Sequence, residues 1–212
     1  MASAIIHMAV AHEINKVIKH DNDKLLIGSI APDISKQIGE SKVKSHFLDN
    51  NDTNIPNMDK FLKKYKHRLD DDFVLGYYIH LYTDYLWFKY FITEIHEKDM
   101  VTKLDGSIVK VDKDMYIKYI YNDYSNLNIQ LLDEYNMDLH IFYRDLPKIE
   151  NIIEEIPMNK LQIIIDQSAL VIQNSKVKKE YVFNIENIKI FIKTSVELIL
   201  SKLEELGIKI KA

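Results

Sequence analysis

The sequence predicts an all-α protein, a single-domain multi-helix bundle, and two observations lead to that prediction. Glycine and proline are scarce, with 5 and 4 residues in 212, so the chain has little of the turn chemistry that an all-β fold needs. Long stretches instead carry apolar residues at helical spacing. A chain of this length can bury one core, and no linker or internal repeat divides it, so we expect one domain over residues 1–212.

Seven stretches have helical periodicity, and the longest is expected to form a long buried central helix. They cover residues 3–19, 58–69, 73–97, 114–136, 148–156, 159–174 and 184–206. The last is expected to stop at Gly207, because glycine is common just beyond a helix C-terminus. Residues 20–57 contain two prolines, two glycines and a polar run, which predicts mostly loop. Asp105-Gly106 predicts a minor hairpin near 101–111.

Charge and composition restrict the possible functions. The net charge of −4 gives no electrostatic signal for nucleic acid or an anionic membrane as the main partner. No apolar run approaches the roughly 20 residues that span a bilayer, and the first ten residues lack the pattern of a signal peptide. We therefore expect a cytoplasmic protein without a transmembrane segment. Cysteine is absent and eight histidines are present, so a transition-metal site must use imidazole and carboxylate.

The eight histidines differ in their predicted surroundings. On helix 3–19, His7 lies in the middle of an apolar stripe. A lone histidine on such a face is more often a hydrogen-bonded core residue than a ligand. Four histidines are expected at the surface: His12, His20, His67 and His96. No environment is predicted for His140.

Helix 73–97 carries a polar pair inside an almost continuous apolar surface. His80 and Asp84 are four residues apart and so lie one turn apart on one face. A buried carboxylate needs a cation, hydrogen-bond donors or a metal ion. Metal binding and a hydrogen-bonded pair fit these two residues equally well. Gly76, one turn earlier, leaves space over this face or allows close helix packing.

Two further residues precede this helix in the predicted loop. Asp33 follows the apolar run LLIGSIAP, where it could present a carboxylate from a fixed loop or cap a helix. His46 lies between loop segments beside Phe47, and alone it carries no functional signal.

Taken in order, the segments IIHMAVAHEI, LLIGSIAPDI, KSHFLD and GYYIHLYTDYLW resemble the zinc-dependent phospholipase C family. That family has an all-helical fold, shared with single-strand-specific nucleases. This chain most resembles its short, non-secreted members. The resemblance covers residues 1–95, whereas residues 114–206 indicate only helical packing.

The resemblance implies a ligand set for one or two zinc ions. Asp33, His46, His80 and Asp84 would form one centre, and Asp84 would also face a second ion near His7. Iron or manganese could replace zinc. The chain lacks the family's processed N-terminal ligand, has Phe88 where a further histidine is common, and has no downstream His-x-x-x-Glu. Asp123 could supply a replacement ligand, although a solvated or tyrosine-bonded aspartate is the more common case at such a position.

The function that the resemblance implies is hydrolysis of a phosphodiester or phosphomonoester. The metal would lower the pKa of bound water from 15.7 toward about 7 and hold a phosphoryl oxygen. Asp33 would either bind metal or accept the proton of that water. Trp87 and Tyr77 would line the site for a small phosphate ester or a phospholipid headgroup, or they would simply pack in the core.

Three other functions remain open at this level. The same ligands could form a non-catalytic metal-binding or structural helical protein with an incomplete site. The doublet His20-Asp21 is typical of helical His-Asp phosphohydrolases, but it lies at the polar end of a predicted helix. A partner-binding domain would use the amphipathic residues 159–206 and leave His80 and Asp84 as a hydrogen-bonded core pair.

Overall fold

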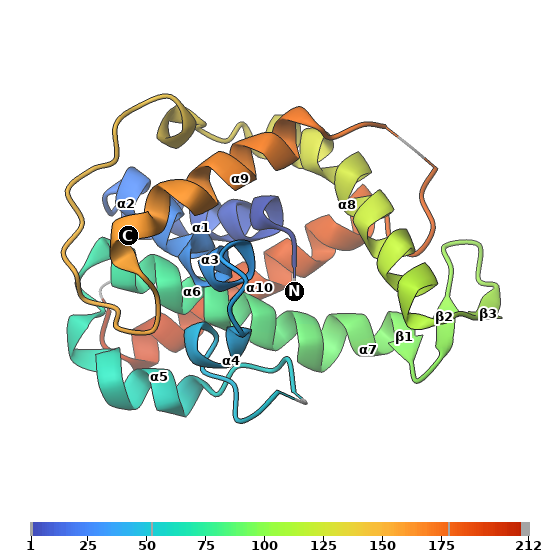
Figure 1. The fold of residues 1–212 in the computed structure, drawn as a ribbon, viewed down its shortest axis with the longest axis horizontal. Coiled ribbons are helices and arrows are strands. Elements are labelled where there is room, and N and C mark those ends of the chain that lie inside the picture. Colours follow the sequence, from blue (N-terminus) through green and yellow to red (C-terminus); the bar gives the residue numbers. More distant parts are fainter. Residues whose placement is uncertain (1, 52, 178, 209–212) are drawn as a thin grey trace.

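A computed structural model describes residues 2–51, 53–177 and 179–208, and these residues are mostly helical, which confirms the all-α prediction (Figure 1). The helices are α1 (Ala4–Ile18), α2 (Asn22–Ile30), α3 (Ile34–Gln37), α4 (Lys42–Ser45), α5 (Met58–Tyr65), α6 (Asp72–Leu86), α7 (Ile92–Ile95), α8 (Lys113–Tyr135), α9 (Leu161–Gln173) and α10 (Ile185–Glu205). Short 3-10 turns occur at Ala31–Asp33, Lys66–Arg68, His140–Phe142 and Met158–Lys160.

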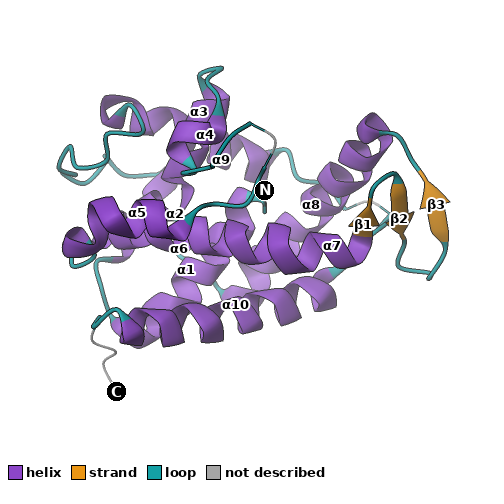
Figure 2. Cartoon of the chain, turned by 90° about the horizontal axis from the view of Figure 1, so that it is seen from below, coloured by secondary structure: helices purple, strands orange, loops and turns teal. Residues whose placement is uncertain are grey.

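Helix α1 lies at the centre of the bundle. It packs against α2, α6, α8 and α10, which explains why its apolar stripe is buried. Figure 2 shows α10 lying alongside α6, and these two helices are also in contact. No helix in the described part of the chain is long and apolar enough to cross a membrane.

Helix α6 is the first part of the predicted long buried helix. Its N-terminus begins after Asp71, whose carboxylate accepts the N–H groups of Phe73 and Val74. Twelve of its fifteen residues are buried, in agreement with its apolar surface. The helix continues through a π-helical turn at Trp87–Phe91 into α7, so helical structure runs without a break from Asp72 to Ile95.

Two glycines allow α2 and α6 to approach closely. A Cβ atom added to Gly28 would lie 2.2 Å from the carbonyl oxygen of Phe73. A Cβ atom added to Gly76 would lie 2.1 Å from the carbonyl oxygen of Leu25. Backbone atoms occupy both positions, so no side chain fits at either. Gly76 therefore serves close helix packing rather than leaving open space.

A small antiparallel sheet follows α7, in strand order β1-β2-β3. Strand β2 (Met100–Thr102) pairs with β3 (Ile108–Lys110), which agrees with the hairpin predicted near 101–111. Gly106 in the connection has φ +79°, a conformation that glycine adopts without strain. Strand β1 (His96–Glu97) takes the place of the predicted last residues of helix 73–97.

Two predicted segments were wrong. Residues 20–57 were expected to be mostly loop, but they include α2, which Asp21 caps by accepting the N–H of Lys24. Residues 148–156 were expected to be helical, but they form turns and irregular backbone. Pro147 and Pro157 bound that stretch, and so short a segment does not nucleate a helix by itself.

Substituting either crossing glycine by alanine is expected to destabilise the protein strongly. Gly76→Ala and Gly28→Ala would each force the two backbones apart. From the cost of overpacking, we expect each to lower the free energy of unfolding by about 3 kcal/mol or more. Gly39→Ala is the control, because nothing lies within 4 Å of its added Cβ and only its left-handed backbone, φ +75°, is penalised by about 1 kcal/mol. Urea unfolding of the three variants measures the difference; equal losses for Gly76→Ala and Gly39→Ala would contradict the close crossing.

Candidate metal centre

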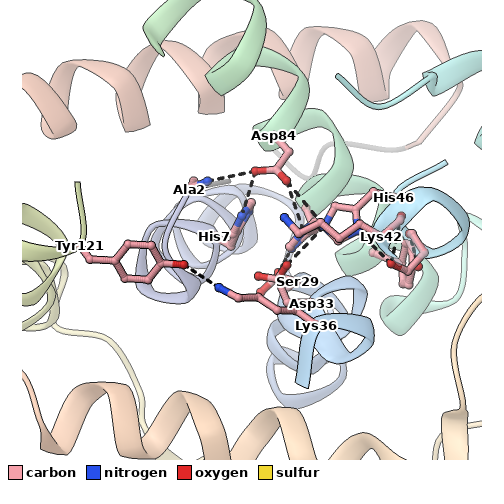
Figure 3. A network of polar contacts seen from close by, with 12 residues as sticks. Ala2, His7, Ser29, Asp33, Lys36, Lys42, His46, Asp84 and Tyr121 are labelled. Carbon is pink, nitrogen blue, oxygen red and sulfur yellow. Dashed lines mark hydrogen bonds and ion pairs between the residues drawn. The ribbon is translucent and has the colours of Figure 1, made fainter. Parts of the chain in front are cut away.

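Five polar side chains from four segments converge in the core, and Figure 3 labels four of them. They are His7 from the middle of α1, Asp33 from the 3-10 turn after α2, His46 directly after α4, and His80 and Asp84 from α6. Asp33 is 6% exposed and the other four are 0–1% exposed. The structure thus brings together five of the six residues that the sequence analysis named as candidate metal ligands, all except Asp123.

Three of these side chains surround one point. The Nε2 atom of His46 lies 3.3 Å from Asp33 Oδ1 and 3.3 Å from His80 Nε2. A zinc ion with bonds of about 2.0–2.1 Å separates neighbouring tetrahedral ligand atoms by about 3.3–3.4 Å. These two separations match that spacing, and all three donor atoms lie within 4.8 Å of one another, so this group could hold a zinc ion.

The orientation of His80 is fixed by a backbone group of α2. Its Nδ1 atom lies 2.7 Å from the carbonyl oxygen of Ser29, which can only accept a hydrogen bond, so Nδ1 carries the proton. Burial and the neighbouring His7 lower the pKa of His80 to about 3. The ring is therefore neutral, and its Nε2 lone pair faces His46 and Asp33, as a metal-bound histidine requires.

The segment that carries His46 is held by Tyr77. The Tyr77 hydroxyl donates a hydrogen bond of 2.5 Å to the carbonyl oxygen of Ser45. The Ser45 hydroxyl lies 2.9 Å from His46 Nδ1 on the side of the ring opposite Nε2. Tyr77 is fully buried, so the structure places it as a support for His46 and not on an accessible wall.

Trp87 also lies in the core. It is 1% exposed and packs in an aromatic cluster with Phe91, Phe183 and Phe191. The core-packing interpretation therefore describes its position, and the substrate-facing interpretation does not.

Asp84 lies between the two halves of the centre. Its Oδ1 atom is 3.3 Å from His7 Nε2 and accepts the backbone N–H of Ala2 at 3.1 Å. Its Oδ2 atom is 3.7 Å from His46 Nε2 and 3.9 Å from His80 Nε2. The His7 ring stacks on that of His80 with centroids 3.8 Å apart.

Unsatisfied polar atoms concentrate in this centre. Among the described residues, six buried side-chain atoms have no hydrogen-bond partner: both ring nitrogens of His7, Asp33 Oδ1, Asp84 Oδ2, the Tyr78 hydroxyl and the Ser195 hydroxyl. The first four belong to the centre. His7 Nε2 is close to Asp84 but outside hydrogen-bonding geometry. Buried polar atoms without partners are costly, and a cation at this point would satisfy the carboxylate oxygens.

Both carboxyl groups remain ionised in this environment. Burial raises the pKa of Asp33, but the contacts with His46 and His80 outweigh it and hold that pKa below its usual range. Burial likewise raises the pKa of Asp84, but the contact with His7 outweighs it and holds that pKa well below its usual value. A carboxylate with so low a pKa is a weak proton acceptor, so Asp33 suits a ligand better than a general base.

The candidate ligands do not form two equivalent sites. Two groups of three side chains could hold a metal ion, His7 with His80 and Asp84, and Asp33 with His46 and His80. Both groups use His80, but its Nδ1 is occupied by Ser29 and its Nε2 has a single lone pair. If His80 binds beside Asp33 and His46, a second ion near His7 retains only two of its three side-chain ligands.

Asp123 lies outside both groups. Its carboxylate accepts the backbone N–H groups of Tyr181, Val182 and Phe183 at 3.0, 2.7 and 3.2 Å. These bonds attach the segment before α10 to α8, which is a structural role that neither alternative in the sequence analysis anticipated. Burial raises the pKa of Asp123 despite these bonds.

The remaining histidines are distributed over the periphery. His67 and His140 are exposed, and His140 pairs with Asp138. His12, His20 and His96 were expected at the surface but are half-buried. His20 pairs with Asp72 at the start of α6, and His96 stacks on Tyr116, so neighbouring elements cover each of them.

Sequence reasoning missed the groups that orient the ligands. The carbonyl of Ser29, the hydroxyl of Ser45 and the amide of Ala2 each contact a candidate ligand, and two of these three are backbone atoms. A backbone donor or acceptor has no residue-type signature. Only Ser45, directly before His46, offered a signal in the sequence.

The metal-free protein is expected to lose stability as the pH falls. The pKa of His80 is 6.5 when unperturbed and about 3 in the folded state, so the unfolded chain takes up a proton that the folded chain does not. Its contribution is complete above pH 6.5 and declines below, by up to about 1.4 kcal/mol per pH unit. Asp33 and Asp84, with lowered pKa values, extend the decline below their ordinary value of 3.8. Urea unfolding between pH 7 and 4, with a chelator present, measures the His80 contribution. A free energy of unfolding that stays constant over this range would contradict the lowered pKa of His80.

Comparisons of the chain with protein-family models, with curated proteins and with solved structures found no match. The case for a function therefore depends on the geometry of the centre and on the motifs in the sequence.

Proposed function

We propose that the protein is a metal-dependent phosphoric-ester hydrolase that resembles zinc-dependent phospholipase C. The observation that carries the proposal is the arrangement of Asp33, His46 and His80. Three buried donor atoms lie at zinc-like spacing, with His80 neutral and oriented by Ser29. Imidazole and carboxylate donors suit zinc, and they also accept iron or manganese.

In this proposal each side chain of the centre has its own role. Asp33, His46 and His80 would hold the ion, which supplies Lewis acidity that activates water and polarises a phosphoryl oxygen. Three protein ligands are typical of catalytic zinc, because the fourth position is kept for water or substrate. Asp84 would balance the positive charge and keep His7 aligned, while Ser29 and Ser45 orient the two imidazoles.

Access to the centre supports a catalytic role. Asp33 lines a pocket of about 280 Å³ that also contacts Ala2, the residue whose amide binds Asp84. A ligand in this pocket would therefore meet the centre from the side of Asp33. A structural metal site is normally closed by four protein ligands and needs no such opening.

A non-catalytic metal-binding protein is the second candidate, and the burial of the centre favours it. Four of the five side chains are at most 1% exposed, which limits the room for substrate at the ion. The two candidates differ in one measurement. Metal-loaded protein that hydrolyses p-nitrophenyl phosphodiesters or phosphorylcholine esters is an enzyme, and metal-loaded protein without phosphoesterase activity is not.

Purified protein is expected to bind about one zinc ion per chain tightly, with three protein ligands. His46→Ala and Asp33→Asn should each lose this ion and any phosphoesterase activity, by about 100-fold or more, because each removes one of three ligands. His67→Ala is the matched control, since His67 is exposed and belongs to neither group of candidate ligands. Elemental analysis and circular dichroism give the readout. A metal-free wild-type protein, after exposure to zinc, would overturn the proposal.

His7→Ala is expected to behave differently from His46→Ala. Because His7 lies outside the group formed by Asp33, His46 and His80, the variant should keep the tightly bound ion and lose only a weaker second one. Zinc titration by calorimetry of the two variants distinguishes the sites. Loss of all zinc binding in His7→Ala would show that the ion lies between His7 and Asp84 instead.

A further inference from the structure

The pocket beside the centre is formed by four segments that are distant in sequence. Its lining comes from the residues at the start of α1, from the 3-10 turn and α3, from one face of α8 and from one face of α9. Asp33 lies in its wall, so one end of the pocket reaches the candidate metal centre. We call it the α8–α9 pocket.

One cation faces this pocket. Among the described residues that line it, Asp33 and Lys36 carry the only charged side chains. Lys36 follows Asp33 by three residues, which puts both on one side of the short helical segment. Figure 3 shows Lys36 extending from the side of Asp33 toward Tyr121, whose hydroxyl accepts a hydrogen bond of 2.6 Å from its ammonium group.

The contact between Lys36 and Tyr121 holds the ammonium group at the pocket. Its Nζ atom also lies 5.1 Å from the centroid of the Tyr121 ring, a cation–π distance. Tyr121 uses one of the three ammonium donors, so further donors remain for a ligand. Both side chains are exposed to water, and a phosphate oxygen would be a stronger acceptor than the phenol because it is charged.

The rest of the lining offers neutral hydrogen-bonding groups between apolar ones. The amides are Gln37, Asn128, Gln167 and Asn174, and the serines are Ser3, Ser125, Ser168 and Ser175. Ile164 and Val171 contribute apolar surface. At about 280 Å³, the pocket is just below the size of sites for drug-sized ligands. A phosphate group with a small polar organic part fits such a volume, whereas acyl chains would have to remain outside.

We propose that the α8–α9 pocket is the substrate site of the hydrolase, that it binds a small, polar phosphate ester, and that Lys36 contacts a phosphate oxygen. This inference rests on the proposed function, because the ester must lie with its phosphate toward the metal centre. It assigns the small phosphate ester that the resemblance implies to one pocket, and it adds a binding residue, Lys36, that no motif in the sequence indicated.

The test uses full-length, zinc-loaded protein and inorganic phosphate as the probe. Lys36→Met removes the charge but keeps most of the apolar stem, and it should weaken phosphate binding about tenfold, as expected for a hydrogen bond to a charged group. Lys36→Arg keeps the charge and should bind within about threefold of the wild type. Lys44→Met is the matched control, because Lys44 is an exposed lysine on α4 that does not line the pocket.

The outcomes separate this inference from the proposed function. Zinc uptake with equal phosphate affinity in Lys36→Met and Lys44→Met overturns the pocket assignment and leaves the metal centre intact. Failure of the wild type to take up zinc overturns the proposed function and this inference with it. A tenfold loss confined to Lys36→Met, with an unchanged zinc content, supports both.

A second arm distinguishes the source of the phosphate group. Hydrolysis is compared for a soluble phosphorylcholine ester and for a short-chain phosphatidylcholine below its micellar concentration. If the pocket binds only the head of the molecule, both are substrates and Lys36→Met raises the KM for each by a similar factor. A KM for either substrate that is insensitive to Lys36→Met would place that substrate outside the α8–α9 pocket and contradict the proposal.

Discussion

The close crossing of α2 and α6 determines where the candidate ligands lie. The backbones of α2 and α6 are in contact at Gly28 and Gly76. The groups of the centre that α2 and α6 contribute lie a fixed number of residues after one of these glycines. His80 follows Gly76 by one turn, and the carbonyl that orients it belongs to Ser29, the residue after Gly28. Asp33 follows five residues after Gly28, at the end of the same segment. A side chain at the crossing would separate Ser29 from His80 and leave the imidazole without its partner, so packing and ligand chemistry depend on the same contact.

The second constraint is electrostatic. Two ionised carboxylates are buried beside three imidazoles. Of these imidazoles, His80 has a strongly lowered pKa and is neutral. Burial alone would favour protonated carboxyls, and the imidazoles oppose it. Unsatisfied oxygens on both Asp33 and Asp84 indicate that the imidazoles do not complete the hydrogen bonding of the carboxylates. A divalent cation resolves both problems at once, because it neutralises the carboxylates and accepts the Nε2 lone pair that the neutral His80 ring directs inward.

The periodicity of single helices could be predicted from the sequence, whereas contacts between helices could not. His7, His80 and Asp84 were predicted to be buried because each lies on an apolar face, and Asp33 and His46 were connected to them only by the family resemblance. Helix α2 was missed because Gly28, Pro32 and Gly39 favour a loop locally, while the role of Gly28 is a contact with α6. Trp87 and Tyr77 were expected either to line a substrate site or to pack in the core. The sequence does not specify the contacts that decide this, which Trp87 makes with α8 and α10 and Tyr77 makes with the segment that carries His46.

The centre is buried, whereas catalysis requires access for substrate, and the position of Asp33 reconciles the two. Helices α1 and α6 enclose His7, His80 and Asp84, which gives a dry, low-dielectric environment where charge interactions are strong. Asp33 instead comes from a 3-10 turn at the edge of the bundle, and it both contacts His46 and lines the α8–α9 pocket. An ion held beside Asp33 would therefore be enclosed on the helix side and approachable on the pocket side. Catalytic metal sites need that asymmetry, because the helix side fixes the ligands and the open side admits substrate.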